Sequence, residues 1–144
     1  MYLVNIYDQP GVAPDTVIEF LYKLLQEREP VANISHREMP TMERHAAFVR
    51  SQPYQAWYII AIEDVDWEWV GAIYLTHTNE IGISILKEAQ GNCYGPRAIR
   101  MLMERHPAAR FLANIAPGNT RSIAMFERLG FELIQFTFEK RRAG

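Results

Sequence analysis

The stretch that decides the fold runs from Glu80 to Phe131 and reads EIGISILKEAQGNCYGPRAIRMLMERHPAARFLANIAPGNTRSIAMFERLGF. Its patterning predicts a strand, a glycine-containing turn, a helix, a second strand and a second helix. The expected elements are a strand at Glu80–Leu86, a helix at Pro96–His106, a strand at Arg110–Ala116, and a helix capped by Asn119 or Thr120 and ended by Gly130. A helix start after such a turn leaves backbone N–H groups without intrahelical partners, and these attract phosphate. The stretch therefore suggests a nucleotide-like cofactor.

The flanking sequence predicts further strands and helices in one continuous domain, residues 1–144. These are strands at Tyr2–Tyr7, Ala56–Ile62, Trp69–Thr76 and Phe131–Phe138, a helix from an Asp15 cap to Glu27, an irregular segment at Glu29–Pro40, and a helix at Thr41–Arg50. A strand–helix–strand unit around the central helix favours a right-handed parallel crossover, whereas the other strands form a meander. We therefore expect an α/β (α+β) fold with a mixed, mostly antiparallel sheet and helices on both faces.

Composition excludes several classes of protein. The 144 residues carry a net charge of −2, so the sequence shows no electrostatic footprint for nucleic acid. One cysteine allows no disulfide framework or thiolate zinc site, and the histidines lack the spacing of metal ligands, so no metal is expected. Without a leader-like or membrane-spanning apolar run, we expect a cytoplasmic protein that does not contact a membrane.

Two motifs resemble those of the GNAT superfamily of acyl-CoA N-acyltransferases. The loop Gln90–Gly95, QGNCYG, resembles the family's (Arg/Gln)-x-x-Gly-x-(Gly/Ala) pyrophosphate loop. The segment Asn119–Phe131, NTRSIAMFERLGF, resembles the helix Asn-x-x-(Ala/Ser)-x-x-(hydrophobic)-Tyr-x-x-x-Gly-Phe. The resemblance implies acetyl-CoA as cosubstrate and an amine as acceptor, either a small molecule or a peptide.

The resemblance also implies which residues contact the cosubstrate. Strand groups would bind the pantetheine arm and thioester carbonyl, the loop would wrap the pyrophosphate, and the last helix would contact CoA. The expected contacts are Ile83, Ser84, Ile85, Gln90, Gly91, Asn92, Cys93, Tyr94, Gly95, Pro96, Asn119, Ser122 and Phe126.

Three positions depart from the family pattern. Cys93 replaces the second loop glycine, so either the loop keeps φ negative there or cofactor affinity is reduced. A small tolerated side chain and a reactive thiol near a helix start are both readings of this cysteine. Phe126 stands where many relatives carry a proton-donating tyrosine, and Asn114 where ribosomal-protein acetyltransferases place a catalytic glutamate.

Acyl transfer to an alkyl amine requires a general base, because the amine is protonated at neutral pH. Glu80 is the first candidate, although a solvated charge at the strand end is the alternative. Alternation places Glu80 on the face of Gly82 and Ser84, unless a bulge changes the parity. His77 in the preceding turn is a second candidate. His36 and Glu38 are candidates for contact with the acceptor, because the resemblance implies that their segment lines that site.

The sequence thus predicts an acetyl-CoA-dependent N-acetyltransferase acting on a primary amine of a small metabolite, an amino sugar or a protein N-terminus. The three departures motivate a rival from another class, a non-catalytic acyl-CoA-binding or interaction module on the same fold. The strand predicted at Phe131–Phe138 is apolar on both faces, which suggests cover by a neighbouring strand or a second subunit, and hence a possible homodimer.

Overall fold

A four-stranded antiparallel sheet lies between two layers of helices. The computed structural model describes residues 1–7, 14–28, 38–63 and 67–142. Its elements are β1 (Tyr2–Asn5), α1 (Pro14–Glu27), α2 (Met42–Arg50), β2 (Ala56–Glu63), β3 (Trp67–Leu75), β4 (Ile81–Ile85), the 3-10 turn η2 (Lys87–Ala89), α3 (Tyr94–Arg105) and α4 (Thr120–Arg128). The strands pair in the order β1-β2-β3-β4.

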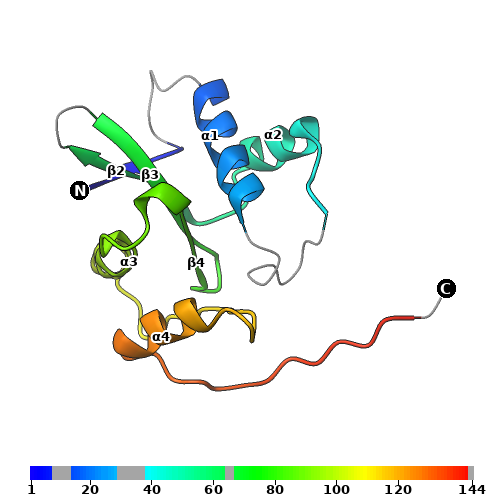
Figure 1. Ribbon diagram of the computed structural model, residues 1–144, viewed down its shortest axis with the longest axis vertical. Coiled ribbons are helices and arrows are strands. Elements are labelled where there is room, and N and C mark those ends of the chain that lie inside the picture. Colours follow the sequence, from blue (N-terminus) through cyan, green and yellow to red (C-terminus); the bar gives the residue numbers. More distant parts are fainter. Residues whose placement is uncertain (8–13, 29–37, 64–66, 143–144) are drawn as a thin grey trace.

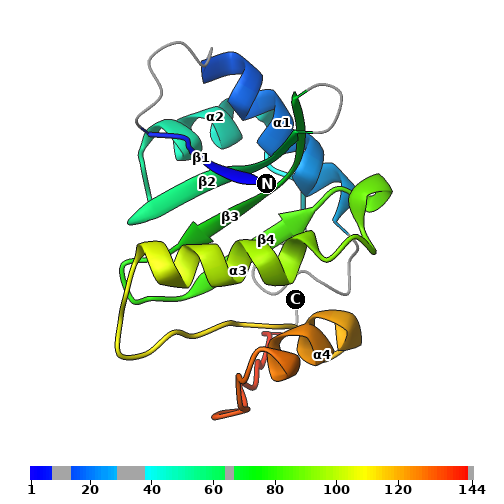
Figure 2. The same cartoon turned by 90° about the vertical axis from the view of Figure 1, so that its left-hand side faces the viewer.

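Helices cover both faces of the sheet, as expected from the sequence. Figures 1 and 2 show α1 and α2 on one face, α3 on the other, and α4 beyond the β4 edge. On the α2 face, Phe48 packs edge-on against Trp57 of β2. On the α3 face, the Tyr58 hydroxyl and His106 Nε2 lie 2.6 Å apart at the end of α3.

The apolar periodicity of α1 predicts that Val17, Ile18, Leu21, Leu24 and Leu25 share one side of the helix. The first four are buried in the core, and Leu25 is half-buried. The helix begins at Pro14, however, so Asp15 lies in its first turn and is not the cap that the sequence suggested. The next helix starts as predicted, since Thr41 accepts a hydrogen bond from the Arg44 amide at 3.2 Å.

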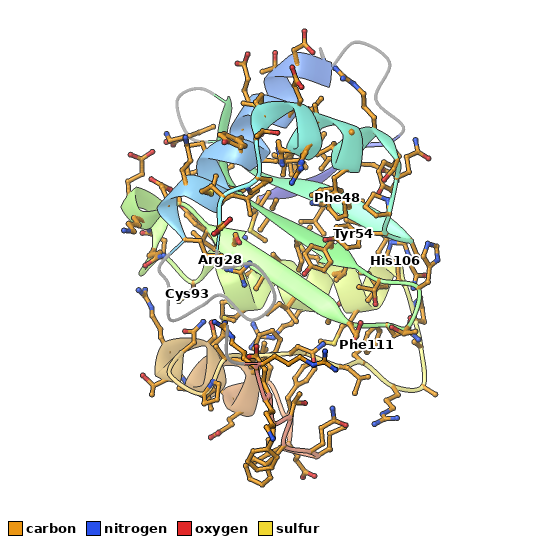
Figure 3. The ribbon with its side chains drawn as sticks, turned by 90° about the vertical axis from the view of Figure 1, so that its right-hand side faces the viewer. Arg28, Phe48, Tyr54, Cys93, His106 and Phe111 are labelled. Carbon is orange, nitrogen blue, oxygen red and sulfur yellow. The ribbon has the colours of Figure 1, made fainter. Side chains whose placement is uncertain are left out.

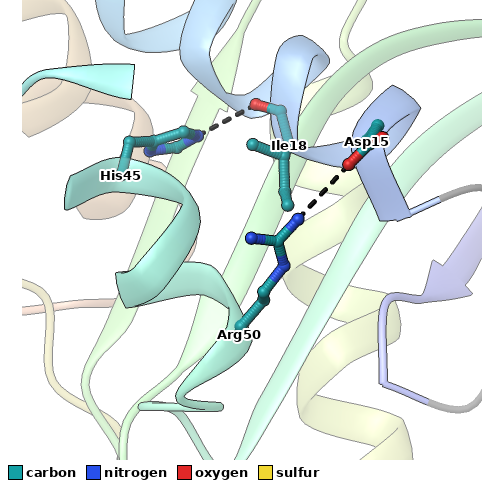
Figure 4. Close-up of polar contacts among 4 residues, drawn as sticks. All are labelled: Asp15, Ile18, His45 and Arg50. Carbon is teal, nitrogen blue, oxygen red and sulfur yellow. Dashed lines mark hydrogen bonds and ion pairs between the residues drawn. The ribbon is translucent and has the colours of Figure 1, made fainter. Parts of the chain in front are cut away.

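Two polar contacts join α1 to α2, and Figure 4 shows both of them. The buried His45 ring places Nε2 2.9 Å from the Ile18 carbonyl oxygen, which therefore accepts the Nε2 proton. Burial holds the pKa of His45 below its ordinary value. The second contact is an ion pair between Arg50 and Asp15, whose side chains are 60% and 82% exposed, so solvent screens it.

The predicted strands at Arg110–Ala116 and Phe131–Phe138 are wrong. In the described structure the first segment makes one parallel bridge, between Glu80 and Leu112, and the second forms no ladder. Both segments are rich in residues that favour strands, but such residues form a strand only where a neighbouring edge is available. The expected parallel pair is accordingly reduced to this single bridge.

The start of α3 also differs from the prediction. The helix begins at Tyr94, not at Pro96, and Cys93 is its N-cap. Pro96 is tolerated as the third residue because the first N–H groups of a helix have no intrahelical acceptor. Within the described ranges, no helix combines the length and the apolar character needed to cross a bilayer.

Candidate active site

A wedge opens where β4 and the segment 110–116 separate. The Ile81 amide donates to the Leu112 carbonyl at 2.8 Å, and the Leu112 amide donates to the Asn79 carbonyl at 2.9 Å. Beyond this bridge the two segments diverge, leaving a cavity of about 120 Å³. The cavity is lined by Arg28, Tyr74, Thr76, Glu80, Ile81, Gly82, Ile83, Ser84, Asn114, Ile115, Ala116, Asn119, Ser122 and Phe126.

The structure brings together six of the site residues predicted from the sequence. Those lining the cavity are Glu80, Ile83, Ser84, Asn119, Ser122 and Phe126. Ile85 lies one residue pair further along β4, outside the lining. Glu38 and His77 are exposed and do not line the cavity. His36 lies outside the described residues, so its predicted contact with the acceptor stays a prediction.

Glu80 is held by three neutral donors. Its carboxylate accepts hydrogen bonds from Asn114 Nδ2 at 2.9 Å, Thr78 Oγ1 at 3.1 Å and Thr76 Oγ1 at 3.3 Å. The Asn114 bond is the main reason why the pKa of Glu80 lies below its ordinary value; desolvation opposes this shift, and the threonine hydroxyls add to it. Glu80 is therefore a fixed, ionised carboxylate at the closed end of the wedge, beside the bridge to Leu112.

The pairing of β4 settles the face on which Glu80 lies. The β3–β4 register is continuous from Gly71↔Ile85 to Leu75↔Ile81, and the register shift in the sheet lies instead between β2 and β3. The described pairing of β4 contains no bulge, so the parity expected from simple alternation holds. Glu80 shares its face with Gly82 and with Tyr74, the partner of Gly82 on β3.

Tyr74 forms the floor of the wedge on this face. A Cβ built on Gly82 would meet the Tyr74 ring at 2.0 Å, so glycine is required for the ring to lie across β4. The opposite side of the ring stacks on Tyr54, with centroids 3.9 Å apart and planes inclined by 3°. Figure 3 shows Tyr54 among the side chains in front of the sheet, and Arg28 near the end of α1.

The outer edge of β4 carries open backbone groups. Strand alternation directs the amide and carbonyl of Ile83 toward the wedge, because the amide of Ile81 already points to Leu112. No hydrogen bond among the described residues uses the Ile83 backbone at this edge. An extended ligand lying in the wedge can therefore pair with β4 as an added strand does.

The loop before α3 presents a run of free amides. Among the described residues, no hydrogen bond uses the backbone N–H groups from Gly91 to Gly95. Gly91 and Cys93 both adopt positive φ, 86° and 62°, so the sequence alternative in which Cys93 keeps φ negative is wrong. Consecutive amides at a helix N-terminus form an anion site.

Arg121 ties α4 to this loop. Its Nη1 donates to Gln90 Oε1 at 2.6 Å, which places a guanidinium beside the amide run. A Cβ on Gly95 would meet Met125 Sδ at 3.0 Å and Ile83 Cδ1 at 4.0 Å, so α3, α4 and β4 converge here. The loop and the wedge therefore belong to one continuous region.

The first and last turns of α4 complete the wall of the cavity. Asn119 caps the helix, since its Oδ1 accepts from the Ser122 amide at 3.3 Å, as the sequence predicted. Phe126 is buried and packs edge-on against Phe131, with centroids 5.0 Å apart. Gly130 adopts φ +93°, which matches its predicted role at the helix end.

Sequence reasoning missed several residues of this region. Asn114 was noted only for the glutamate that it replaces, yet it is the main partner of Glu80. Tyr74 and Arg28 line the cavity, and Arg121 approaches the loop. The position of Arg121 in the first turn of a helix that follows the loop is a signal that could have been used. Within the ranges that the structure covers, no group of His, Cys, Asp and Glu side chains is placed to hold a metal ion.

Comparison with known proteins decides the family. A profile described as acetyltransferase (GNAT) domain matches residues 12–132, most of the chain. The chain belongs to the GNAT acetyltransferase family. A comparison with curated proteins found no match.

Several solved structures share this GNAT fold. A domain from Methanocaldococcus jannaschii has a TM-score of 0.75 and 23% identity, over 87% of this chain and 88% of that one. A phosphinothricin acetyltransferase from Sinorhizobium meliloti, crystallised with AcCoA, gives 0.65 and 22%, over 94% and 77%. A ribosomal-protein-alanine N-acetyltransferase from Brucella melitensis gives 0.63 and 16%, over 92% and 85%.

Proposed function

We propose that this protein transfers an acetyl group from acetyl-CoA to a primary amine. The observation that carries the proposal is the fixed carboxylate of Glu80, which lies in the same cavity as the open edge of β4. Membership of the GNAT family and the free amides at the start of α3 support acetyl-CoA as the donor.

The chemistry of the loop fits the CoA pyrophosphate. The amides from Gly91 to Gly95 and the guanidinium of Arg121 supply hydrogen-bond donors and positive charge at the N-terminus of α3. From there the pantetheine arm would follow the edge of β4, where the Ile83 backbone offers one donor and one acceptor. Asn119, Ser122 and Phe126 would bound the arm on the opposite side.

Acetyl-CoA supplies an activated acyl group whose thiolate is a fair leaving group. Glu80 would attract the acceptor ammonium and, directly or through a water, remove the proton that blocks attack. An N–H on the β4 edge would stabilise negative charge that develops on the carbonyl oxygen. Phe126 has no proton to donate, so the departing thiolate would be protonated from solvent.

The acceptor remains an amine of one of three classes: a small metabolite, an amino sugar or a protein N-terminus. All three are compatible with the anionic carboxylate of Glu80 and the threonine hydroxyls that flank it. The positive φ of Cys93 supports an alternative function, because a strained loop would weaken cofactor binding. This alternative is a non-catalytic acyl-CoA-binding or interaction module on the same fold.

One experiment separates the two functions. Acetyl-CoA consumption is measured over a panel of small amines, amino sugars and peptides for the wild type, Glu80→Gln and the control Glu68→Gln, which changes an exposed carboxylate on β3. Loss of a general base predicts a fall of about 10²–10⁴-fold in kcat for Glu80→Gln only, with acetyl-CoA binding retained. Binding without turnover across the panel would favour the non-catalytic module.

A further inference from the structure

The C-terminal segment 131–142 exposes apolar side chains that a soluble monomer normally buries. Figure 1 shows this segment leaving α4 as an extended strand-like run that departs from the rest of the fold. The exposed fractions are 76% for Leu133, 59% for Ile134, 76% for Phe136 and 91% for Phe138. Contiguous exposed apolar surface of this kind marks an interaction site.

The backbone of this segment is equally unsatisfied. The Phe131 amide donates to the Phe126 carbonyl at 3.0 Å, but no hydrogen bond among the described residues involves residues 132–138. An extended segment with unpaired backbone N–H and C=O groups and exposed apolar side chains readily pairs with another strand. The partner that this segment needs is therefore a strand.

The sequence of the segment is self-complementary in antiparallel register. Glu132, Ile134, Phe136, Phe138 and Lys140 alternate with the other residues and so share one face. If two copies pair about Phe136, Glu132 faces Lys140, Ile134 faces Phe138 and Phe136 faces itself. Cross-strand pairs of opposite charge and of apolar residues both stabilise a ladder. On the other face, Glu139 already pairs with Arg141 at 2.9 Å.

We propose that a second copy of this chain binds here, through antiparallel pairing of the two 132–140 segments about a twofold axis at Phe136. Such an interface is isologous and closed, because each copy offers the same surface to the other. Because the cross-strand pairs match only when the partner carries the same sequence, a second copy of this chain fits this segment better than an unrelated protein.

The area that this pairing can bury reaches the lower end of the range for a specific dimer. Fully buried, the four phenylalanine rings at positions 136 and 138 of two copies would contribute about 600 Å². Leu133 and Ile134 of both copies and the ladder itself bring the total toward roughly 1,000 Å², the lower bound of a specific interface.

The segment 111–115 has unpaired backbone groups to which the paired strands could add. Between Phe111 and Ile115, the described backbone bonds involve only Leu112, which turns toward β4. Alternation directs the backbone groups of Phe111 and Ala113 to the opposite side. A two-stranded ribbon alone is marginal, so an added neighbour at this edge would extend the sheet through the dimer.

The first test is the mass of the full-length protein in solution, followed by sedimentation equilibrium from micromolar to submillimolar concentration. The wild type is expected to be a dimer, and Phe136→Glu a folded monomer, because the monomer already exposes this side chain. Met42→Glu is the control, since Met42 is a 41% exposed apolar residue on α2. It should remain a dimer. A monomeric wild type, or a dimer that Phe136→Glu leaves intact, would overturn the proposal.

Charge exchange tests the register. Glu132→Lys and Lys140→Glu should each weaken the dimer, since each places like charges opposite one another twice. The double variant should restore dimerisation to within a few-fold of the wild type. Failure of the double variant to restore it contradicts the antiparallel register.

Disulfide trapping tests the axis. In a Cys93→Ser background, Phe136→Cys should oxidise to a covalent dimer, because directly opposed residues have Cα atoms within disulfide reach. Ile134→Cys is the control, since its two copies would lie four residues apart along the ribbon, on the order of 13 Å. Equal trapping at both positions, or trapping at neither, would rule out the axis at Phe136.

Discussion

Glu80 illustrates how neutral hydrogen-bond donors can hold the pKa of a carboxylate below its ordinary value. Asn114 contributes most to the lowered pKa, and it is 34 residues away in sequence. The contact exists because the bridge at Leu112 brings the segment 110–116 beside the start of β4. No local pattern encodes it, which is why the sequence identified Glu80 but not its partner.

Substitution of Asn114 should shift the titration of Glu80 upward. Asn114→Ala removes the main stabilising bond, and Asn114→Asp places a second carboxylate against the first, so the pKa should rise in both and more in the second. We expect kcat/KM to fall by about tenfold in Asn114→Ala, because the carboxylate loses the hydrogen bond that fixes it in place. Carbon NMR of a labelled Glu80 carboxyl follows the pKa, and an unchanged titration in both variants would refute the role of Asn114.

Cys93 lies in the left-handed region, which costs a residue with a Cβ about 1–2 kcal/mol. Cys93→Gly should therefore be as stable as the wild type or up to ~1 kcal/mol more stable, after the entropy of glycine in the unfolded chain is counted. It should bind acetyl-CoA at least as tightly. Cys93→Val is the contrasting variant, because a branched side chain is least tolerated there. Denaturant unfolding and calorimetry measure both effects; weaker binding by Cys93→Gly would reveal a specific contact of the thiol.

At the scale of elements, the sequence predicts the ends and buried sides of helices better than it predicts which segments pair as strands. The faces of α1 and the cap of α4 were correct because they depend on residues within one or two turns. The pattern of the segments 110–116 and 131–138 predicts strands, yet a strand also needs an edge to pair with. A proline predicts the first turn of a helix but not its first residue, so α3 begins at Tyr94, two residues before Pro96.

The contact between β3 and β4 depends on a glycine. Gly82→Ala would drive a methyl group into the Tyr74 ring, so we expect a loss of about 1–3 kcal/mol of unfolding free energy and a distorted wedge. Tyr74→Ser removes the ring, so the double variant should lose less than the sum of the two single losses. A double-mutant cycle by urea unfolding measures the coupling, and strict additivity would show that the ring does not occupy this space.

At the scale of the whole molecule, stability should depend on the neutral form of His45. Burial lowers the pKa of His45 in the folded state, and the pKa of His106 is lowered mainly by burial and further by Arg105. The unfolded chain binds these protons near pH 6.5, so the unfolding free energy should fall as pH decreases from that value toward the folded pKa. His45→Gln should flatten this dependence.

The most direct test of the account is thermal unfolding of the wild type with acetyl-CoA, free CoA or ATP. The free amides of the loop and the open edge of β4 predict stabilisation by both CoA species, about 2.7 kcal/mol at a hundred times the dissociation constant, and less by ATP at the same concentration, because ATP lacks the pantetheine arm that pairs with β4. No shift with millimolar acetyl-CoA would contradict a cosubstrate site in the wedge.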